Sequence, residues 1–198
     1  GVVTDAPALV TVSEDLMIEG WRTVAKGRAI SAISTGGIGE DGVGVDSSLA
    51  PLGHAIQWND RRGETYSHAL SQTTHAKNYP AILLDFSSSA GKWAWLRDHK
   101  PEELNGAKHW LTMTDYPLAV WAGTAFMSST LAPRTSCYDV FTRHWIPEFL
   151  DHVHAPPLPP MIEAGGIVGT MKRGALVDAG AADNNTLLVA GGHDHPVA

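Results

Sequence analysis

The sequence predicts an α/β fold in which a mixed sheet is flanked by helices. Strand-like segments rich in β-branched residues and glycine stand toward both ends, at 29–46 and 166–194. Between them, residues 59–123 contain several segments that open on a capping residue or a proline, as helices do. A chain of 198 residues can bury one sizeable core, so we expect one domain or two tightly joined lobes.

The first expected element is a helix near the start of the chain. Thr11 with Glu14 three residues later resembles a capping box, and apolar residues then recur at mostly helical spacing until Gly27. Strand-like segments follow: AISAIST at 29–35, GVGVD after a glycine-rich turn, and an apolar stretch that ends at Trp58. We therefore expect one helix and then two or three neighbouring strands.

The middle of the chain predicts further helices. Asn59 can cap a helix that runs to about Gln72, Ser89 can cap a second, and Pro101 can open a third. A fourth spans about 114–123, where a proline falls in the first turn and a glycine ends the helix.

The rest of the chain predicts a connector and two strands. HAPPLPP at 154–160 cannot form a regular helix or sheet ladder, so we expect a rigid connector; a peptide for a proline-binding partner is the alternative. GIVGTMK at 166–172 and TLLVAGGHD at 186–194 predict strands on either side of a glycine-bearing link.

Composition and charge exclude several classes of protein. The net charge of −7 comes without a cluster of Lys and Arg, which argues against a nucleic-acid groove. No apolar run approaches the roughly 18 to 20 residues of a membrane span, and the first residues lack the features of a secretory signal. Cys137 is the single cysteine, so no internal disulfide can form and the cytoplasm is the expected location.

Gly37, Gly39 and Gly42 satisfy the GxGxxG pattern of dinucleotide-binding turns. The segment that follows them is strand-like rather than helical, and Glu40 with Asp41 would put two carboxylates where phosphate charge should lie. We therefore predict a glycine-rich hairpin whose bend exposes Glu40 at its tip.

Asp194 is the leading candidate for chemistry. It follows the apolar stretch TLLVA and two glycines, so it would lie at a strand end where small residues leave room for a substrate. An Asp that caps the next helix is the alternative. His193 and His195 flank it, and two imidazoles with a carboxylate could bind zinc or iron. Alternation along a strand would point Asp194 away from both histidines unless the strand has already ended.

One motif carries a family resemblance. SSSAGKWAWLRDH at 87–99 fits, at every defined position, the first signature pattern of the FGGY carbohydrate kinases, in which Lys92 and Trp95 are defining residues. Three further segments are similar to that family in the same order: ISAIST leading to GVGVD, AIQWNDRR, and LLVAGGHDH. The resemblance spans about residue 15 to the last residue.

The resemblance implies an actin-like, ribonuclease-H-like fold of two lobes, with sugar bound mainly by the first lobe and ATP, carrying Mg²⁺, mainly by the second. Residues 1–198 look like most of the N-terminal lobe, without its opening strand and Asp-x-Gly-Thr phosphate turn and without the ATP lobe. The chain would then be a fragment that transfers phosphate poorly or not at all, with no ATP-binding residue and no metal ligand of its own. Relatives are frequently dimers, so a homodimer is an expected assembly.

Carried over residue by residue, the resemblance makes Asp194 the general base that accepts the proton of the sugar hydroxyl. The sugar-contacting positions that it implies are Gly39, Glu40, Trp58, Ser87 and His195. The ring of Trp58 can cover the C–H side of a carbohydrate, and Glu40 can accept hydrogen bonds from adjacent hydroxyls. A core tryptophan and a solvated hairpin tip are the respective alternatives for these two residues.

The leading hypothesis for function is ATP-dependent phosphorylation of a sugar or polyol hydroxyl, with this chain supplying the sugar site. Two alternatives stay open. One is a non-catalytic sugar-binding or assembly domain, because a fold does not fix a function. The other is a metal-dependent hydrolase that uses His193, Asp194 and His195. The sequence does not select among glycerol, pentuloses, hexuloses, aldonates and tetritols as the substrate.

Overall fold

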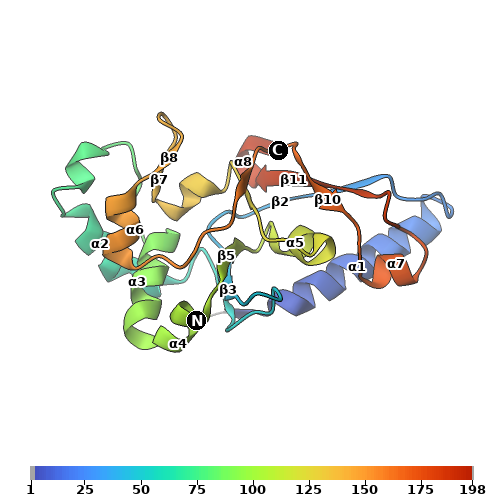
Figure 1. Ribbon diagram of the computed structural model, residues 1–198, viewed down its shortest axis with the longest axis horizontal. Coiled ribbons are helices and arrows are strands. Elements are labelled where there is room, and N and C mark those ends of the chain that lie inside the picture. The colour runs from blue at the N-terminus through green and yellow to red at the C-terminus, as the bar shows by residue number, and fades with distance from the viewer. Residues whose placement is uncertain (1–2, 198) are drawn as a thin grey trace.

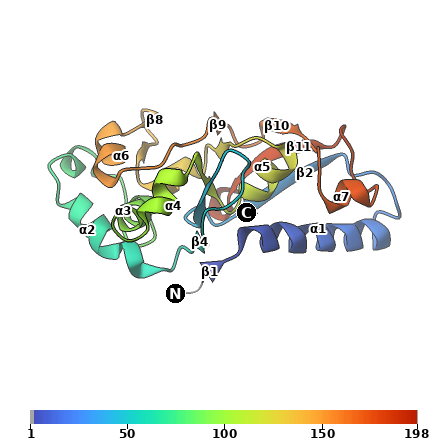
Figure 2. The same ribbon diagram turned by 60° about the horizontal axis from the view of Figure 1, so that its bottom comes forward.

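The chain forms an elongated molecule with a sheet toward one end and a group of helices at the other (Figure 1). This computed structural model describes residues 3–197. The sheet half contains β2 (Ala32–Gly37), β10 (Ile167–Thr170) and β11 (Leu187–His193), with helices α1 (Ala6–Thr23), α5 (Tyr116–Ala122) and α7 (Ala175–Asp178). β11 pairs antiparallel with β10 and parallel with β2, so the sheet is mixed, as predicted. Figure 2 shows α1 running along one side of this half.

A four-stranded antiparallel sheet joins the two halves. Its order is β1 (Val3–Thr4), β4 (Ala55–Ile56), β3 (Gly42–Val45) and β5 (His109–Thr112). Successive side chains of a strand point to opposite faces of the sheet. On β5, Leu111 belongs to the hydrophobic core of the sheet half, whereas its neighbour Trp110 belongs to the core of the helical half.

The helical half is built around α3 (Ser89–His99), which packs against α2 (Glu64–Ser71), α4 (Pro101–Gly106) and α6 (Pro147–Val153). The short 3₁₀ turns are η1 (Arg61–Gly63), η2 (Ala76–Asn78) and η3 (Ala132–Thr135). The short strand β6 (Met127–Ser128) pairs with β9 (Met161–Ile162), and β7 (Tyr138–Asp139) pairs with β8 (His144–Trp145). None of the helices within residues 3–197 combines the length and apolar character of a membrane span.

The first helix begins earlier than the sequence predicts. α1 starts at Ala6, because the Asp5 carboxylate accepts a hydrogen bond from the Ala8 N–H at 3.0 Å and Pro7 fits in the first turn. Thr11 lies inside the helix, where its hydroxyl donates to the Pro7 carbonyl at 3.2 Å. The predicted capping box is therefore wrong.

The helices of the middle of the chain lie where they are predicted, with small differences at their caps. η1 and α3 are preceded by the N-cap residues Asp60 and Ser88, each adjacent to the residue predicted for that role. α5 ends at Gly123, whose φ of 68° is a left-handed conformation that suits glycine. Residues 154–160 form neither helix nor strand, as predicted.

The predicted glycine-rich hairpin is wrong. β2 and β3 do not pair with each other, because β2 pairs with β11 in one sheet and β3 pairs with β4 and β5 in the other. Gly42 allows the Trp110 indole to lie against β3, where an added Cβ would overlap the ring. Residues 38–41 thus cross between two sheets, and Glu40 is only 6% exposed instead of standing at a solvated tip.

Candidate active site

A pocket of about 390 Å³ opens beside the end of β11. Its volume is in the range of small-molecule sites. Ten residues from five separate segments line it: Ile38, Glu40, Trp58, Asp85, Phe86, Ser87, Arg134, His193, Asp194 and His195. The structure therefore brings together all the site residues predicted from the sequence except Gly39, which is not among the lining residues.

The edge of the pocket that carries Asp194 is formed by β2 and β11. These strands run parallel, so their carboxyl ends lie side by side, the usual position of ligand sites in α/β sheets. Their close approach depends on Gly191, because an added Cβ there would overlap the Thr35 carbonyl oxygen. β11 ends at His193 and the chain turns at once into α8 (Asp194–Val197). Asp194 therefore stands at a strand end, as predicted.

The Asp194 side chain is 47% exposed, so its carboxylate can reach a group in the pocket. Its Oδ1 accepts a hydrogen bond from the His195 N–H at 2.9 Å and lies 3.4 Å from Nε2 of His193. Asp194 is thus both the first residue of a short helix and a pocket carboxylate. A cap would precede the helix and accept from its second or third N–H, whereas Asp194 is the first helical residue and accepts from the adjacent His195.

Glu40 is held by two side chains of the pocket. Nε of Arg134 donates to Oε1 of Glu40 at 2.7 Å, and Nη2 of Arg134 contacts the same oxygen. The other carboxylate oxygen lies 3.6 Å from Nε2 of His193. An added Cβ on Gly39 would come within 2.5 Å of Cγ of Arg134 and 2.9 Å of Cδ2 of His193, so glycine lets these side chains close around Glu40.

His193, Asp194 and His195 converge, because the strand has ended before Asp194. One donor atom from each residue lies within 4.8 Å of the others, and the two imidazole rings are nearly perpendicular at 5.1 Å between centroids. Two imidazoles and a carboxylate form a donor set that a first-row transition metal accepts. The prediction that this chain has no metal ligand of its own can therefore be tested by measuring the metal content of the protein.

Trp58 and Ser87 also line the pocket. Trp58 is 45% exposed, so it is not a core residue. Ser87 is almost buried, and its hydroxyl donates to Oδ1 of Asp85 at 2.6 Å, which leaves its lone pairs available to an incoming donor. Asp85 itself also lines the pocket.

Four lining residues were not predicted from the sequence: Ile38, Asp85, Phe86 and Arg134. Asp85 and Phe86 directly precede the signature segment at 87–99, and this adjacency is the signal that could have found them. Arg134 lies 94 residues from Glu40 in a loop-like segment, and no local pattern links the two. Only the folded chain shows that Arg134 is the partner of Glu40.

Buried hydrogen bonds support the end of β11 from behind. Oδ2 of Asp115 accepts the Ser128 N–H at 2.8 Å, and the Ser128 hydroxyl donates to the Gly191 carbonyl at 2.5 Å. The Thr130 hydroxyl accepts the His193 N–H at 3.0 Å. Burial raises the pKa of Asp115 to about 7, since its charged form is taken out of water. The strand end that carries Asp194 is therefore fixed from the side of β6.

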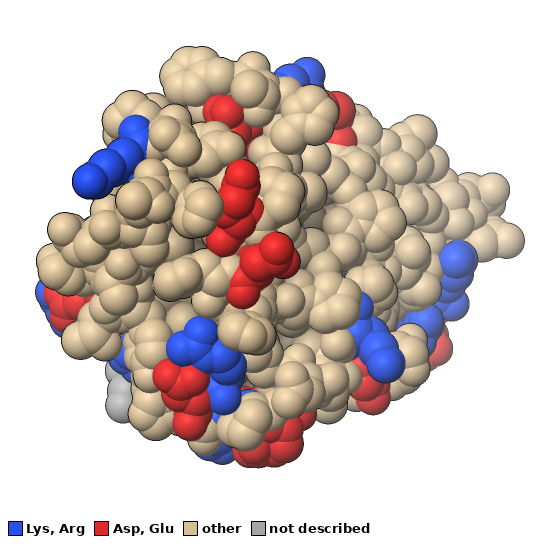
Figure 3. Space-filling view, turned by 60° about the vertical axis from the view of Figure 1, so that its left-hand side comes forward, with Lys and Arg blue, Asp and Glu red and all other residues tan. Residues whose placement is uncertain are grey.

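The charge of the pocket is mainly acidic. Glu40, Asp85 and Asp194 line it together with one basic residue, Arg134, which already pairs with Glu40. On the face of the molecule shown in Figure 3, several acidic side chains form a short row near the middle, and basic side chains lie around it, some of them beside further acidic side chains. The pocket thus offers mostly hydrogen-bond acceptors, which suit a ligand that donates.

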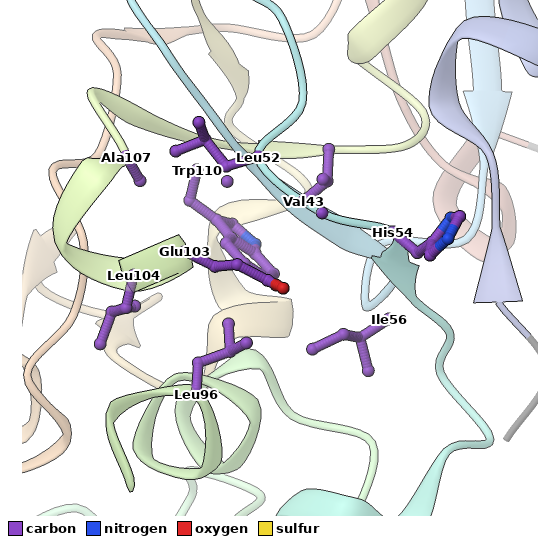
Figure 4. Close-up of a pocket in the computed structure, with 11 residues that line it drawn as sticks. Val43, Leu52, His54, Ile56, Leu96, Glu103, Leu104, Ala107 and Trp110 are labelled. Carbon is purple, nitrogen blue, oxygen red and sulfur yellow. The ribbon is translucent and has the colours of Figure 1, made fainter. Parts of the chain in front are cut away.

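A second cavity, beside Trp110, does not compete with this pocket. It lies among β3, α3 and α4 and is lined mainly by apolar side chains, with the carboxylate of Glu103 directed toward it (Figure 4). Its volume is about 10 Å³, which is barely enough for one water molecule. A sugar therefore cannot occupy it.

Comparison with known proteins identifies the family. The model of the N-terminal domain of the FGGY family of carbohydrate kinases matches residues 17–198. A xylulose kinase from Streptomyces rubiginosus is 27% identical over 168 residues, which cover 78% of this chain and 35% of the relative. A glycerol kinase from Herminiimonas arsenicoxydans is 28% identical over 128 residues, or 60% of this chain and 26% of the relative.

Solved structures show the same fold. The gluconate kinase from Lactobacillus acidophilus aligns with 97% of this chain and 39% of its own length, at a TM-score of 0.85 and 19% identity. The Plasmodium falciparum glycerol kinase with ADP aligns with 98% of this chain and 40% of its own, at a TM-score of 0.84 and 20% identity.

The fold is therefore the first lobe of the actin-like architecture, as the resemblance implied. The chain spans about a quarter to a third of the length of these curated relatives. Since the family model covers nearly the whole chain, the chain belongs to the FGGY family of carbohydrate kinases, as part of its N-terminal domain.

Proposed function

We propose that the protein transfers the γ-phosphate of ATP to a sugar or polyol hydroxyl, with Asp194 as the general base. A hydroxyl is a poor nucleophile at neutral pH, so a carboxylate within hydrogen-bond reach assists by accepting its proton as the oxygen attacks phosphorus. The observation that carries the proposal is the half-exposed carboxylate of Asp194 at the edge of a pocket lined mainly by acceptors. Membership of the family supports the reaction class.

The sugar would lie in this pocket with its reacting hydroxyl at Asp194. The exposed ring of Trp58 offers an apolar face to sugar C–H groups. Glu40, held in place by Arg134, can accept a hydrogen bond from a hydroxyl, and the exposed imidazole of His195 can donate or accept one. Ser87 can accept a further hydrogen bond, since its own proton goes to Asp85.

ATP brings the transferred phosphoryl group, and Mg²⁺ is held largely by the phosphates and water. Among the residues that the structure describes, the glycines of segment 37–42 do not form a phosphate cradle. Thr114 fills the space in front of Gly37, and Arg134 fills the space in front of Gly39. We therefore assign the nucleotide to the part of the relatives that this chain does not span, and the sugar site to residues 1–198.

A panel of D-xylulose, glycerol and D-gluconate with ATP tests the reaction class in the protein that contains this chain. The panel covers the substrates named for the relatives. We expect ADP release that depends on one panel member. Binding of a panel member without ADP release would favour the non-catalytic sugar-binding alternative, and neither binding nor turnover would reject the proposal for these substrates.

Two smaller proposals concern the location and the assembly of the protein. We propose that it is cytoplasmic, since its single cysteine, Cys137, is buried and burial raises the pKa of its thiol. A homodimer, proposed from the family resemblance, is tested by light scattering of the purified protein. A mass of one chain at micromolar concentration would reject the dimer.

A further inference from the structure

Lys92 is a fully buried lysine in the signature segment, with 0% exposure. A buried ammonium group is costly unless it is hydrogen-bonded and paired with a charge. Its Nζ donates to the carbonyl oxygen of Glu40 at 2.6 Å and, more weakly, to that of Ile56 at 3.5 Å. These two carbonyls belong to different segments of the chain, both of which lead into the pocket.

Asp41 lies beside Lys92 and completes the contact between these segments. Its Oδ1 accepts the backbone N–H of Trp58 at 2.5 Å, and its charge favours the protonated form of Lys92. Lys92 and Asp41 together therefore tie residues 38–41 to residues 56–58. One of these segments carries the Glu40 side chain, and the other carries Trp58.

The helix that presents Lys92 is held rigidly against its neighbours. An added Cβ on Gly91 would overlap the Ser67 hydroxyl and lie 2.5 Å from the Gly63 carbonyl oxygen, so α3 packs closely against η1 and α2. The next residue, Trp93, is fully buried. Lys92 thus approaches the two pocket segments from a fixed position.

We propose that Lys92 and Asp41 are positioning residues that set the distance between Glu40 and Trp58, and thereby the width of the sugar pocket. The proposal assigns a physical role to the signature lysine, which is 52 residues from Glu40 in the sequence. Its consequence for sugar binding rests on the proposed function, but its consequence for Trp58 does not. Neither residue lines the pocket itself.

The charge of Lys92 is expected to respond to pH. Burial lowers the pKa of Lys92 from 10.5 to about 8, while the carboxylates of Asp41, Glu40 and Asp60 oppose that shift and Arg62 adds to it. Above pH 8 Lys92 loses its charge, which weakens its hydrogen bonds to the two carbonyl oxygens, so the pocket segments should loosen. Global stability should move in the other direction, since a lysine with a lowered folded pKa adds stability as pH rises from about 8 to 10.5.

The test uses the protein labelled with 5-fluorotryptophan and needs no sugar. The fluorine resonance of Trp58 is assigned by its loss in Trp58→Phe. In the unmutated protein we expect this resonance to shift with a midpoint near pH 8, the pKa of Lys92. Lys92→Met should abolish that step, while Lys108→Met, which changes an exposed lysine, should keep it.

Asp41→Asn provides a second variant that preserves an acceptor for the Trp58 N–H. Because the Asp41 charge raises the Lys92 pKa, its removal should move the Trp58 midpoint below pH 8. With a panel sugar that binds, both variants should weaken binding about tenfold, as expected for a lost charge-assisted hydrogen bond.

A Trp58 resonance with no step near pH 8, or one that persists unchanged in Lys92→Met, would overturn the proposal. So would a midpoint that stays in place in Asp41→Asn. If the fluorine results appear as expected but no panel sugar binds, the proposed function is rejected for these substrates and the positioning role stands. If sugar binds equally well to all variants, the effect of the pair on the width of the pocket is refuted.

Discussion

The exposed wall of the pocket, which carries Asp194, and the buried support behind it, which consists of Lys92 and Asp41, use charged groups in different ways. In the wall, the Asp194 side chain is 47% exposed. In the support, Lys92 has no exposure and bonds to backbone carbonyls, and Asp41 bonds to a backbone N–H. Glu40 belongs to both regions, since its carboxylate lines the pocket and its carbonyl accepts from Lys92.

The difference shows how burial assigns a charged residue to a role. A charge open to solvent keeps its capacity to meet a ligand, whereas a buried charge must be satisfied by the protein and therefore fixes the backbone around it. Variants of the wall should change turnover or binding and leave stability nearly unchanged. Variants of the support should change stability or the position of the wall.

The largest expected effect is that of Asp194→Asn. In the protein that contains this chain, it should reduce turnover by at least about a hundredfold, as for a removed general base, and leave sugar binding nearly intact. Steady-state ADP release and calorimetric titration of the sugar measure the two quantities. Turnover close to that of the unmutated protein would remove Asp194 from the chemistry.

Gly91→Ala should have the next largest effect, on stability. The added Cβ would overlap Ser67 and Gly63, so we expect a loss of about 2 kcal/mol in the free energy of unfolding, as for overpacked cores. Denaturant unfolding measures it. Gly20→Ala is the matched control, because nothing lies within 4 Å of its added Cβ in α1, and it should raise stability slightly. Equal stability of both variants would contradict the close packing behind Lys92.

Glu40→Ala and Trp58→Ala should each weaken sugar binding about tenfold, or about 1.4 kcal/mol. Trp58→Ala should change the unfolding transition little, whereas Glu40→Ala should also lower stability, because it leaves Arg134 without its carboxylate partner. The Glu40→Ala variant lacks the carboxylate that accepts hydrogen bonds from sugar hydroxyls, and the Trp58→Ala variant lacks the apolar face that contacts sugar C–H groups. Glu163→Ala is the control, since Glu163 pairs with Arg143 on an exposed part of the surface. Unchanged affinity for a panel sugar would remove the altered residue from the site.

The smallest expected effect concerns metal. We predict that the purified protein carries no stoichiometric transition metal, although the donor atoms of His193, Asp194 and His195 lie within 4.8 Å of one another. Elemental analysis after dialysis measures the metal content, with His195→Ala as the comparison. One bound zinc or iron per chain that His195→Ala loses would instead favour the hydrolase alternative and make this wall a metal site.

The sequence predicted the local elements and much of the pocket, for different reasons. α5 and β11 follow from patterns within a few residues: a proline and a glycine that delimit the helix, and an apolar strand before two glycines. Glu40 and Trp58 came from the family resemblance, Asp194 came from its place after an apolar strand as well as from that resemblance, and the structure places all three on one pocket. Their roles in binding and catalysis remain predictions.

The error that concerns the pocket has a long-range physical cause. Glu40 was expected at an exposed hairpin tip, because the sequence shows a turn between two strands but not which strands pair. β2 pairs instead with β11, from the far end of the chain, and Arg134 folds over Glu40. Pairings of this kind depend on packing between distant segments, which local patterns do not record.

The sequence by itself determined the family, the order of most elements and the carboxylate at the end of the last strand, because motif spacing, capping and periodicity are properties of neighbouring residues. Tertiary structure alone decided that Glu40 is buried against Arg134 and that Lys92 holds the segments of Glu40 and Trp58 together. The physical reason is that burial sets what a charged group can do, and burial exists only once distant segments have packed.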